Sequence, residues 1–294
     1  MDQLISELAT KARKAGRSLA ASDYSTRVNA VLAIADALIQ RKAEILAANE
    51  LDISQAKESG MVESLIDRLL LTSERIDGIA HAARKVSQLP DPLHQTLRER
   101  TLENGLHLRQ VSVPFGVVGM IYEARPNVTV DASVILLMSG NAALLRGSAS
   151  AAHSNAKLIE IMKGALATTT ISPDVLQRVP SDDRNSVQAL LHARGKIDLV
   201  IPRGSAALIR MVVDEARVPT IETGAGVCHV YFDESANEKI AIPILMNAKT
   251  QRPSVCNAAE TLLVHQARVK DLLPAALKAL HAAHVTLHCD ERSL

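Results

Sequence analysis

The side chains best suited to covalent chemistry in this sequence are three cysteines, Cys228, Cys256 and Cys289. A thiol is the strongest protein nucleophile near neutral pH if it is exposed and its pKa is lowered. Cys256 lies in the loop-like segment QRPSVCN, where Arg252 supplies positive charge and main-chain amides can point at a substrate oxygen. Cys256 is therefore the candidate nucleophile. The alternative, a small residue in packing, fits Cys228 in the apolar run VCHVYF much better.

A second candidate group is the segment IYEARPNVTVDAS, in which Arg125 and Asn127 follow an apolar run and precede another. If the first run is a strand, both residues lie at its carboxyl end, where ligands bind in parallel sheets. The amide of Asn127 could donate to a developing oxyanion, or it could only cap the helix.

The segment IDLVIPRGSAAL has the pattern of a strand, a turn and a helix start. Gly204 permits close approach of the backbone, and the amino end of the next helix can hold a phosphate. Neither GxGxxG nor GxxxxGK occurs in the sequence, so any dinucleotide must bind in another manner. The histidines of HAAHVTLHC match neither HExxH nor a paired CxxC, and we expect no metal site there.

The elements that must position these residues change in character along the chain. Residues 26 to 49 have apolar side chains at helical spacing, and the first ninety residues predict a helical layer. Alternation in GLHLRQVSVP predicts an extended ribbon near 100–114, a candidate oligomerisation arm. Short strands are predicted at 117–122, 142–146, 175–179, 197–201 and 218–222. Strand and helix in alternation predict an α/β fold with a parallel sheet.

The chain length and composition predict two domains and a small ligand. We place one α/β unit with the N-terminal helices at 1–226 and the start of a second α/β unit at 227–294. Lysine plus arginine number 33 against 32 acidic residues, and aromatic residues make up 2%, which argues against nucleic acid and membrane partners. The N-terminus has no continuous apolar segment, so a cytoplasmic location is expected.

Four blocks, IYEARPNVTVD, LVIPRG, ETGAGVCHVY and NAKTQRPSVCNAAETLLV, together resemble the gamma-glutamyl phosphate reductases of the aldehyde dehydrogenase superfamily. The resemblance extends from the N-terminal helices to about Thr286. It implies an aldehyde dehydrogenase-like fold with a cofactor domain that lacks the glycine fingerprint, a catalytic domain and an oligomerisation ribbon. Members of that family continue well beyond Leu294, so we expect a truncated catalytic domain here.

The resemblance also implies roles for single residues. Cys256 becomes the nucleophile, and Asn127 becomes the oxyanion-hole side chain alongside the Cys256 amide. The implied cofactor is NADPH/NADP, and its lining comprises Arg146, Gly147, Pro202, Arg203, Gly204 and Glu222. From charge and location, Arg125 and Arg252 are candidates for the substrate phosphate or carboxylate. Ser148, Ala149 and Ser150 stand where the family often has a glycine and a Lys-Glu pair, and this difference bears on the ribose and 2'-phosphate contacts and so on the choice between NADPH and NADH.

The implied reaction is the second step of proline biosynthesis, in which L-glutamyl 5-phosphate is reduced to L-glutamate 5-semialdehyde through a cysteinyl thioester. A homo-oligomer and contact with glutamate 5-kinase are expected with it. One rival is a hydrolytic aldehyde dehydrogenase, because Glu222 lies 34 residues before Cys256; Glu222 could equally be a strand-end carboxylate paired with an arginine. Another rival is an inactive truncated scaffold.

Overall fold

The structure is a computed structural model that describes residues 1–183, 185–222, 226–253 and 255–293. Thr223, Gly224 and Ala225 of the ETGAG segment and Ser254 of the cysteine loop lie outside the described residues. The chain divides into two compact units, Met1–Thr223 and Gly224–Leu294. Within the described part, no helix combines the length and apolar character needed to cross a membrane.

The first unit opens with the predicted helical layer. Its helices before the sheet are α1 (Asp2–Ala20), α2 (Tyr24–Gln40), α3 (Lys42–Glu58), α4 (Glu63–Leu69) and α5 (Ser73–Val86). The Asp23 carboxylate caps α2 by accepting from the Thr26 amide at 2.7 Å. The apolar pattern over residues 26 to 49 does not form one helix, because the chain turns at Arg41 and α3 begins. Buried Asn49 and Asp52 then anchor α3 to the rest of the unit.

A four-stranded parallel sheet lies at the centre of this unit, with strand order β5-β4-β3-β6. The strands are β3 (Val117–Tyr122), β4 (Ala142–Arg146), β5 (Leu176–Arg178) and β6 (Leu199–Arg203). The helices are α6 (Pro126–Met138), α7 (Ala152–Leu166), α8 (Asn185–His192) and α9 (Ala206–Glu215), with short 3-10 turns η1 (Ala149–Ala151) and η2 (Pro173–Val175). The predicted α/β class is confirmed.

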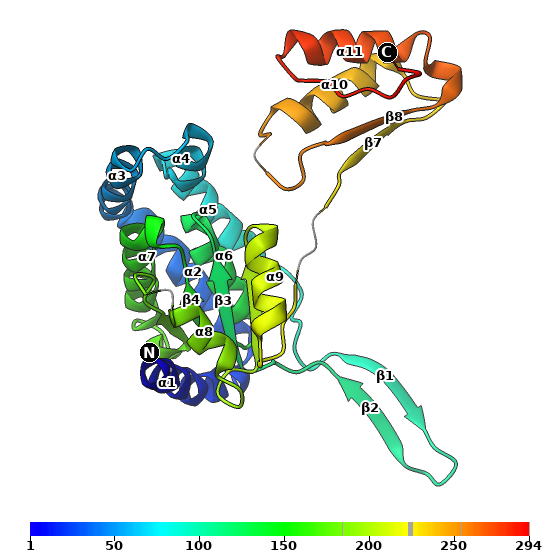
Figure 1. Ribbon diagram of the computed structural model, residues 1–294. Coiled ribbons are helices and arrows are strands. Elements are labelled where there is room, and N and C mark those ends of the chain that lie inside the picture. The colour runs from blue at the N-terminus through cyan, green and yellow to red at the C-terminus, as the bar shows by residue number, and fades with distance from the viewer. Residues whose placement is uncertain (184, 223–225, 254, 294) are drawn as a thin grey trace. The chain divides into compact units, whose positions relative to one another are not determined.

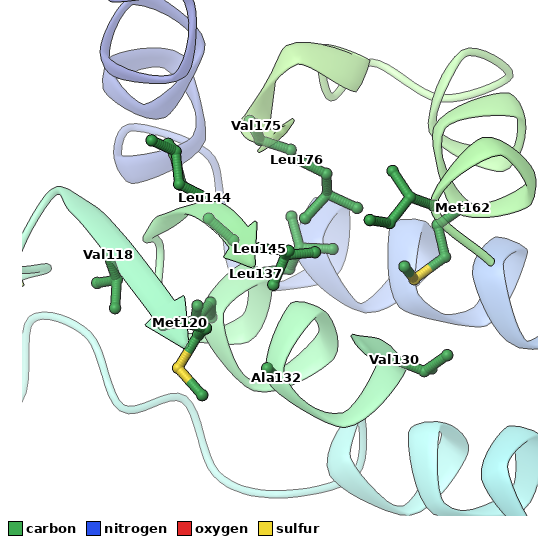
Figure 2. Close-up of a cluster of buried hydrophobic side chains, with 14 of the residues drawn as sticks. Val118, Met120, Val130, Ala132, Leu137, Leu144, Leu145, Met162, Val175 and Leu176 are labelled. Carbon is green, nitrogen blue, oxygen red and sulfur yellow. The ribbon is translucent and has the colours of Figure 1, made fainter. Parts of the chain in front are cut away.

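Helices cover both faces of the sheet (Figure 1). Contacts place α6 and α7 together with α2, whereas α1 contacts β4 and α8, and α8 contacts α9. All six residues of β3 are buried, as expected for a central parallel strand. Figure 2 shows part of the core, where Val118 and Met120 of β3 and Leu144 and Leu145 of β4 lie near side chains from α6 and α7. The sheet is therefore a rigid support for the loops at its carboxyl edge.

The predicted ribbon is a hairpin of two antiparallel strands, β1 (Thr96–Thr101) and β2 (His107–Val111). Its turn closes through the Leu102 amide, which donates to the Leu106 carbonyl at 2.9 Å, and Gly105 adopts a φ of 83° there. Every residue of both strands is exposed. The hairpin thus contributes nothing to the core of its own unit.

The second unit has its own smaller core. It contains the parallel strands β7 (His229–Phe232) and β8 (Thr261–Val264), the helices α10 (Glu238–Thr250) and α11 (Leu272–Ala282), and a 3-10 turn η3 (Gln266–Arg268). Apolar side chains from β7, α10 and α11 pack together, among them Phe232, Leu245 and Leu280. The loop between α10 and β8 carries Cys256.

Candidate active site

The sheet order defines where a ligand would bind in the first unit. From β3 the chain moves to β4 and β5 on one side, and then crosses to β6 on the other side of β3. The loops after β3 and β6 therefore lead into helices on opposite faces, which is the topological switch point where open α/β sheets bind ligands. Arg125, Asn127, Pro202, Arg203 and Gly204 all lie on or just after these two neighbouring strands. The parallel pairing of β3 with β6 therefore brings these residues to the same edge of the sheet.

Arg125 and Asn127 lie at the amino end of α6. Arg125 is the N-cap residue, with non-helical φ and ψ of −143° and 89°, and Pro126 occupies the first helical turn, where its missing N–H is no loss. Both side chains are half-buried. The amino end of a thirteen-residue helix carries partial positive charge, so an anionic group is favoured beside them.

The Asn127 side chain is held by Asp131, one helical turn further along α6. The Asn127 Nδ2 donates to the Asp131 Oδ2 at 3.0 Å. Burial raises the pKa of Asp131, and the hydrogen bond from Asn127 opposes that rise. Because an ionised carboxylate only accepts, this contact orients the amide with its nitrogen toward Asp131 and leaves a second Nδ2 hydrogen for another acceptor. Asn127 does not cap α6, because the N-cap residue is Arg125 and no side chain caps this helix. The sequence analysis missed Asp131, although its spacing of four residues from Asn127 could have indicated the contact.

The turn between β6 and α9 is closely packed against the loop after β3. The Glu123 amide donates to the Arg203 carbonyl at 3.2 Å. A Cβ atom at Gly204 would come within 2.7 Å of the Glu123 side chain and 2.8 Å of Leu208. Ser205 caps α9, its hydroxyl accepting from the Leu208 amide. The ten-residue helix α9 starts at this capped turn, and the amino end of such a helix can hold a phosphate group, which is the role that the sequence suggested for this turn.

The carboxyl end of β4 lies beside that of β3 and carries the next two candidate residues, Arg146 and Gly147. Arg146 is half-buried, and its guanidinium donates to the Ser186 hydroxyl at 3.3 Å and the Ser181 carbonyl at 3.4 Å. Gly147 is buried, and a Cβ atom there would collide with Asn155 and lie 3.0 Å from the Tyr122 ring. Ser148 caps the turn that follows, accepting from the Ser150 amide at 3.2 Å. The serines that depart from the family pattern thus bond to their own turn.

The two side chains that pack against Gly147, Asn155 and Tyr122, belong to a buried hydrogen-bond network. The Tyr122 hydroxyl bonds to Thr129 Oγ1 at 2.8 Å, and Thr129 Oγ1 donates to Asn155 Oδ1 at 2.8 Å. Burial raises the pKa of Tyr122 to about 12, so the phenol stays protonated and can donate. These three polar groups link the end of β3, α6 and α7. The sequence offered no signal for this network because its members are far apart in the chain.

In the second unit, Cys256 is exposed, as a reactive thiol requires. Arg252 is also exposed and begins the turn that leads to it, since the Val255 amide donates to the Arg252 carbonyl at 3.3 Å. The turn is anchored at its far end, where the Ala259 amide donates to the Ala248 carbonyl at 2.9 Å. The loop thus presents the thiol from a fixed support.

The remaining candidates differ in their surroundings. Cys228 is half-buried, not fully buried as expected, and its thiol donates to the Cys256 carbonyl at 3.5 Å. Glu222 is exposed and lies just beyond Thr220, which pairs with Val200 in an isolated bridge. His281 and His284 are exposed at the end of α11. Among the described residues, no three histidine, cysteine or acidic side chains gather as a metal site would require.

The sheet order and its switch-point loops define a doubly wound α/β protein of the kind that binds nucleotides. Residues 2–293 match the aldehyde dehydrogenase family. A gamma-glutamyl phosphate reductase from Thermobifida fusca is 51% identical over 288 residues, which are 98% of this chain and 69% of that protein. The chain belongs to the aldehyde dehydrogenase family, and the family indicates a nicotinamide dinucleotide cofactor.

Solved structures agree with this assignment. The gamma-glutamyl phosphate reductase of Thermotoga maritima matches with a TM-score of 0.88 and 41% identity, over 98% of this chain and 70% of that one. The gamma-glutamyl phosphate reductase of Saccharomyces cerevisiae matches with a TM-score of 0.69 and 31% identity, over 97% of this chain and 71% of that one. The predicted family resemblance is confirmed.

Proposed function

We propose that this chain carries out the reaction for which these relatives are named, the reduction of L-glutamyl 5-phosphate to L-glutamate 5-semialdehyde with release of phosphate. This reaction is the second step of proline biosynthesis from glutamate. The observation that carries the proposal is an exposed cysteine, Cys256, in a chain that is 51% identical to a gamma-glutamyl phosphate reductase. The expected source of the substrate is a glutamate 5-kinase, whose direct contact with this chain stays a prediction.

In the proposed mechanism, the Cys256 thiolate attacks the acyl carbon of the substrate. The bond from that carbon to the phosphate oxygen breaks, phosphate leaves, and a thioester remains on Cys256. NADPH, when bound, supplies the hydride that reduces this thioester. The carbon–sulfur bond then breaks, which releases the aldehyde and regenerates the thiolate.

The supporting groups have separate proposed tasks. Arg252 attracts the negative charge of the acyl phosphate toward the cysteine loop. Asn127 donates its second Nδ2 hydrogen to an oxygen that gains charge, and Arg125 favours an anion at the amino end of α6. The dinucleotide is proposed to bind at the carboxyl ends of β6 and β4, where Gly204 and Ser205 lead into α9 and where Arg146 and Gly147 lie. The preference for NADPH over NADH is part of the proposal.

The test is the reverse reaction, phosphate-dependent reduction of NADP by glutamate semialdehyde. Cys256→Ser should lower turnover about a thousandfold or more with unchanged thermal unfolding, because serine is a far weaker nucleophile at neutral pH. Cys289→Ser, which removes a thiol outside the candidate site, is the matched control and should keep its activity. Oxidation of the aldehyde to a free acid without phosphate would instead favour a hydrolytic dehydrogenase with Glu222 as its base.

The exposed hairpin supports a second proposal, that copies of this chain assemble through β1 and β2. A two-stranded hairpin is only marginally stable in water without packing. Its strands also carry exposed apolar side chains, including Leu97 at 59% exposure and Leu108 at 41%. Another copy of the chain would cover both these side chains and the open strand edges.

A further inference from the structure

Two cysteines that are 28 residues apart in sequence lie side by side in the second unit. Parallel pairing of β7 with β8 brings the residues just before each strand together. The Cys228 carbonyl accepts from the Glu260 amide at 2.9 Å and from the Thr261 amide at 3.1 Å. The main chain at Cys228 is therefore fixed to the segment that leaves the cysteine loop.

The cysteine loop then turns back toward Cys228. The Ala258 amide donates to the Val255 carbonyl at 3.2 Å, which closes a tight turn around Cys256. Ala258 and Ala259 are buried, and the Lys249 ammonium donates to the Ala259 carbonyl at 2.9 Å. These contacts hold the Cys256 carbonyl oxygen 3.5 Å from the Cys228 sulfur.

The short distance from the Cys228 sulfur to the Cys256 main chain brings the two residues close enough for a disulfide to be considered. A disulfide joins residues whose Cα atoms lie about 4.4–6.8 Å apart. The carbonyl oxygen and Cα of Cys256 are attached to the same carbon, so the Cys228 sulfur already lies alongside the Cys256 main chain. The Cys256 side chain is exposed. Closing the bond needs a rotation of that side chain and a local adjustment of the loop, while β7 and β8 stay paired.

We propose that Cys228 is a resolving thiol, which captures Cys256 as an intrachain disulfide when a hydroperoxide has oxidised it. In the first step the Cys256 thiolate attacks the peroxide oxygen, the O–O bond breaks, and a sulfenic acid and one molecule of water or alcohol form. In the second step the Cys228 sulfur attacks the sulfenic sulfur, water leaves, and the S–S bond forms. Two thiols are oxidised and one peroxide is reduced, so atoms and electrons balance.

A neighbouring thiol changes how far peroxide can oxidise the exposed Cys256 thiol. A sulfenic acid without a nearby thiol is oxidised further to sulfinic acid, which is irreversible in most proteins. The disulfide is reversible by thiol reductants. Cys228 would thus convert permanent damage at Cys256 into a recoverable state. The inference depends on the exposed thiol and its neighbour, and it stands whether or not the chain reduces an acyl phosphate.

The experiment treats the full chain with hydrogen peroxide, blocks remaining thiols with N-ethylmaleimide, and identifies cross-linked peptides by mass spectrometry without reduction. The expected product is a single cross-link between the Cys228 and Cys256 peptides in a chain that runs as a monomer on a non-reducing denaturing gel. Dithiothreitol should restore both thiols. A cross-link that involves Cys289, a link between two chains, or two alkylated thiols after oxidation of Cys256 to sulfinic acid would overturn the proposal.

Variants separate a resolving role from a purely structural one. In Cys228→Ser, peroxide should convert several-fold more Cys256 to sulfinic acid than in the parent, whereas Cys289→Ser should match the parent. Cys228→Ala provides a second variant with the same expected result if serine disturbs folding. Equal sulfinic acid yields in the parent and in both Cys228 variants would overturn the proposal. Because every readout is a peptide mass, an inactive enzyme would count against the proposed function and not against this inference.

Discussion

Asn127 can donate to a substrate oxygen only if its amide group is held in the correct orientation. The contact with Asp131 supplies that orientation within a single helix, since residues four apart in sequence lie on the same face. Asp131 is half-buried, and this burial raises its pKa because the charged carboxylate loses contact with water. The hydrogen bond from Asn127 offsets part of that unfavourable desolvation. We therefore expect Asp131 to orient the amide of Asn127, the candidate oxyanion donor.

We therefore expect Asp131→Ala to lower kcat roughly ten- to hundredfold while KM changes little, because a misdirected donor weakens the transition state more than substrate binding. Asp131→Asn is the matched control, since its side-chain oxygen still accepts from Asn127, and it should recover most of the activity. Steady-state kinetics on both variants measure the effect. A loss that appears mainly in KM, or that Asp131→Asn fails to recover, would contradict an orienting role.

Gly147 illustrates a residue whose importance comes from the space around it. A methyl group there would meet Asn155, which is already committed to Thr129, and the edge of the Tyr122 ring. We expect Gly147→Ala to lower the free energy of unfolding by about 1–3 kcal/mol, as overpacking of a tight site does. Urea denaturation measures the loss. Gly78, where a Cβ atom meets nothing within 4 Å, provides the control as Gly78→Ala; equal effects in the two variants would refute the packing argument.

The sequence predicted single site residues well where their role follows from the strand they terminate. Arg125, Asn127 and Gly204 were placed at strand ends by pattern alone, and they are found there. It could not predict Asn155 or the contact of Cys228 with Cys256. Those depend on which way a side chain points or on which strands pair, and a single sequence carries neither.

At the scale of elements, β3 and β4 coincide with their predicted ranges because continuous apolar runs between turn signals specify fully buried strands. The prediction of a strand over 218–222 was wrong. Within this described segment only Thr220 pairs, in a bridge with Val200, because Pro219 has no N–H to extend a ladder. The strand β6 runs two residues later than predicted, and Pro202 is tolerated there because β6 lies at the edge of the sheet.

In the hairpin, every residue of β1 and β2 is exposed, so its apolar side chains lack a packing surface within their own unit. If copies of the chain assemble through it, Leu108→Asp combined with Val111→Asp should reduce the molar mass in solution toward the 31.6 kDa of one chain. Helical content should stay unchanged, because neither strand packs on the core. Light scattering after size exclusion measures the mass. Gln110→Glu adds a charge to the same strand without removing apolar surface and should keep the parent mass; parent mass in the double variant would exclude the hairpin as the interface.

At the scale of the whole molecule, two units with separate cores divide the chemistry between them. The first unit has a large core around the parallel sheet and holds every candidate cofactor residue, including Arg146, Gly147 and Gly204. In the described part of the second unit, six buried side chains form the core, and this unit holds Cys256 and Arg252. A chain built in this way is not expected to unfold in one step, because each core can be lost separately.

Because the two units have separate cores, calorimetry can show which unit is stabilised when the cofactor binds. A ligand stabilises only the states to which it binds, and at a hundred times its Kd the gain is about 2.7 kcal/mol. For a unit of this size the gain corresponds to a rise of about 5–10 °C in Tm. We expect NADPH to shift the unfolding transition of the larger unit by this amount and NADH at the same concentration to shift it less. Gly204→Ala, whose Cβ would crowd the β6–α9 turn, should abolish the shift. An equal shift with NADH would refute the NADPH preference. A shift confined to the smaller unit would contradict the proposal that the cofactor binds to the larger one.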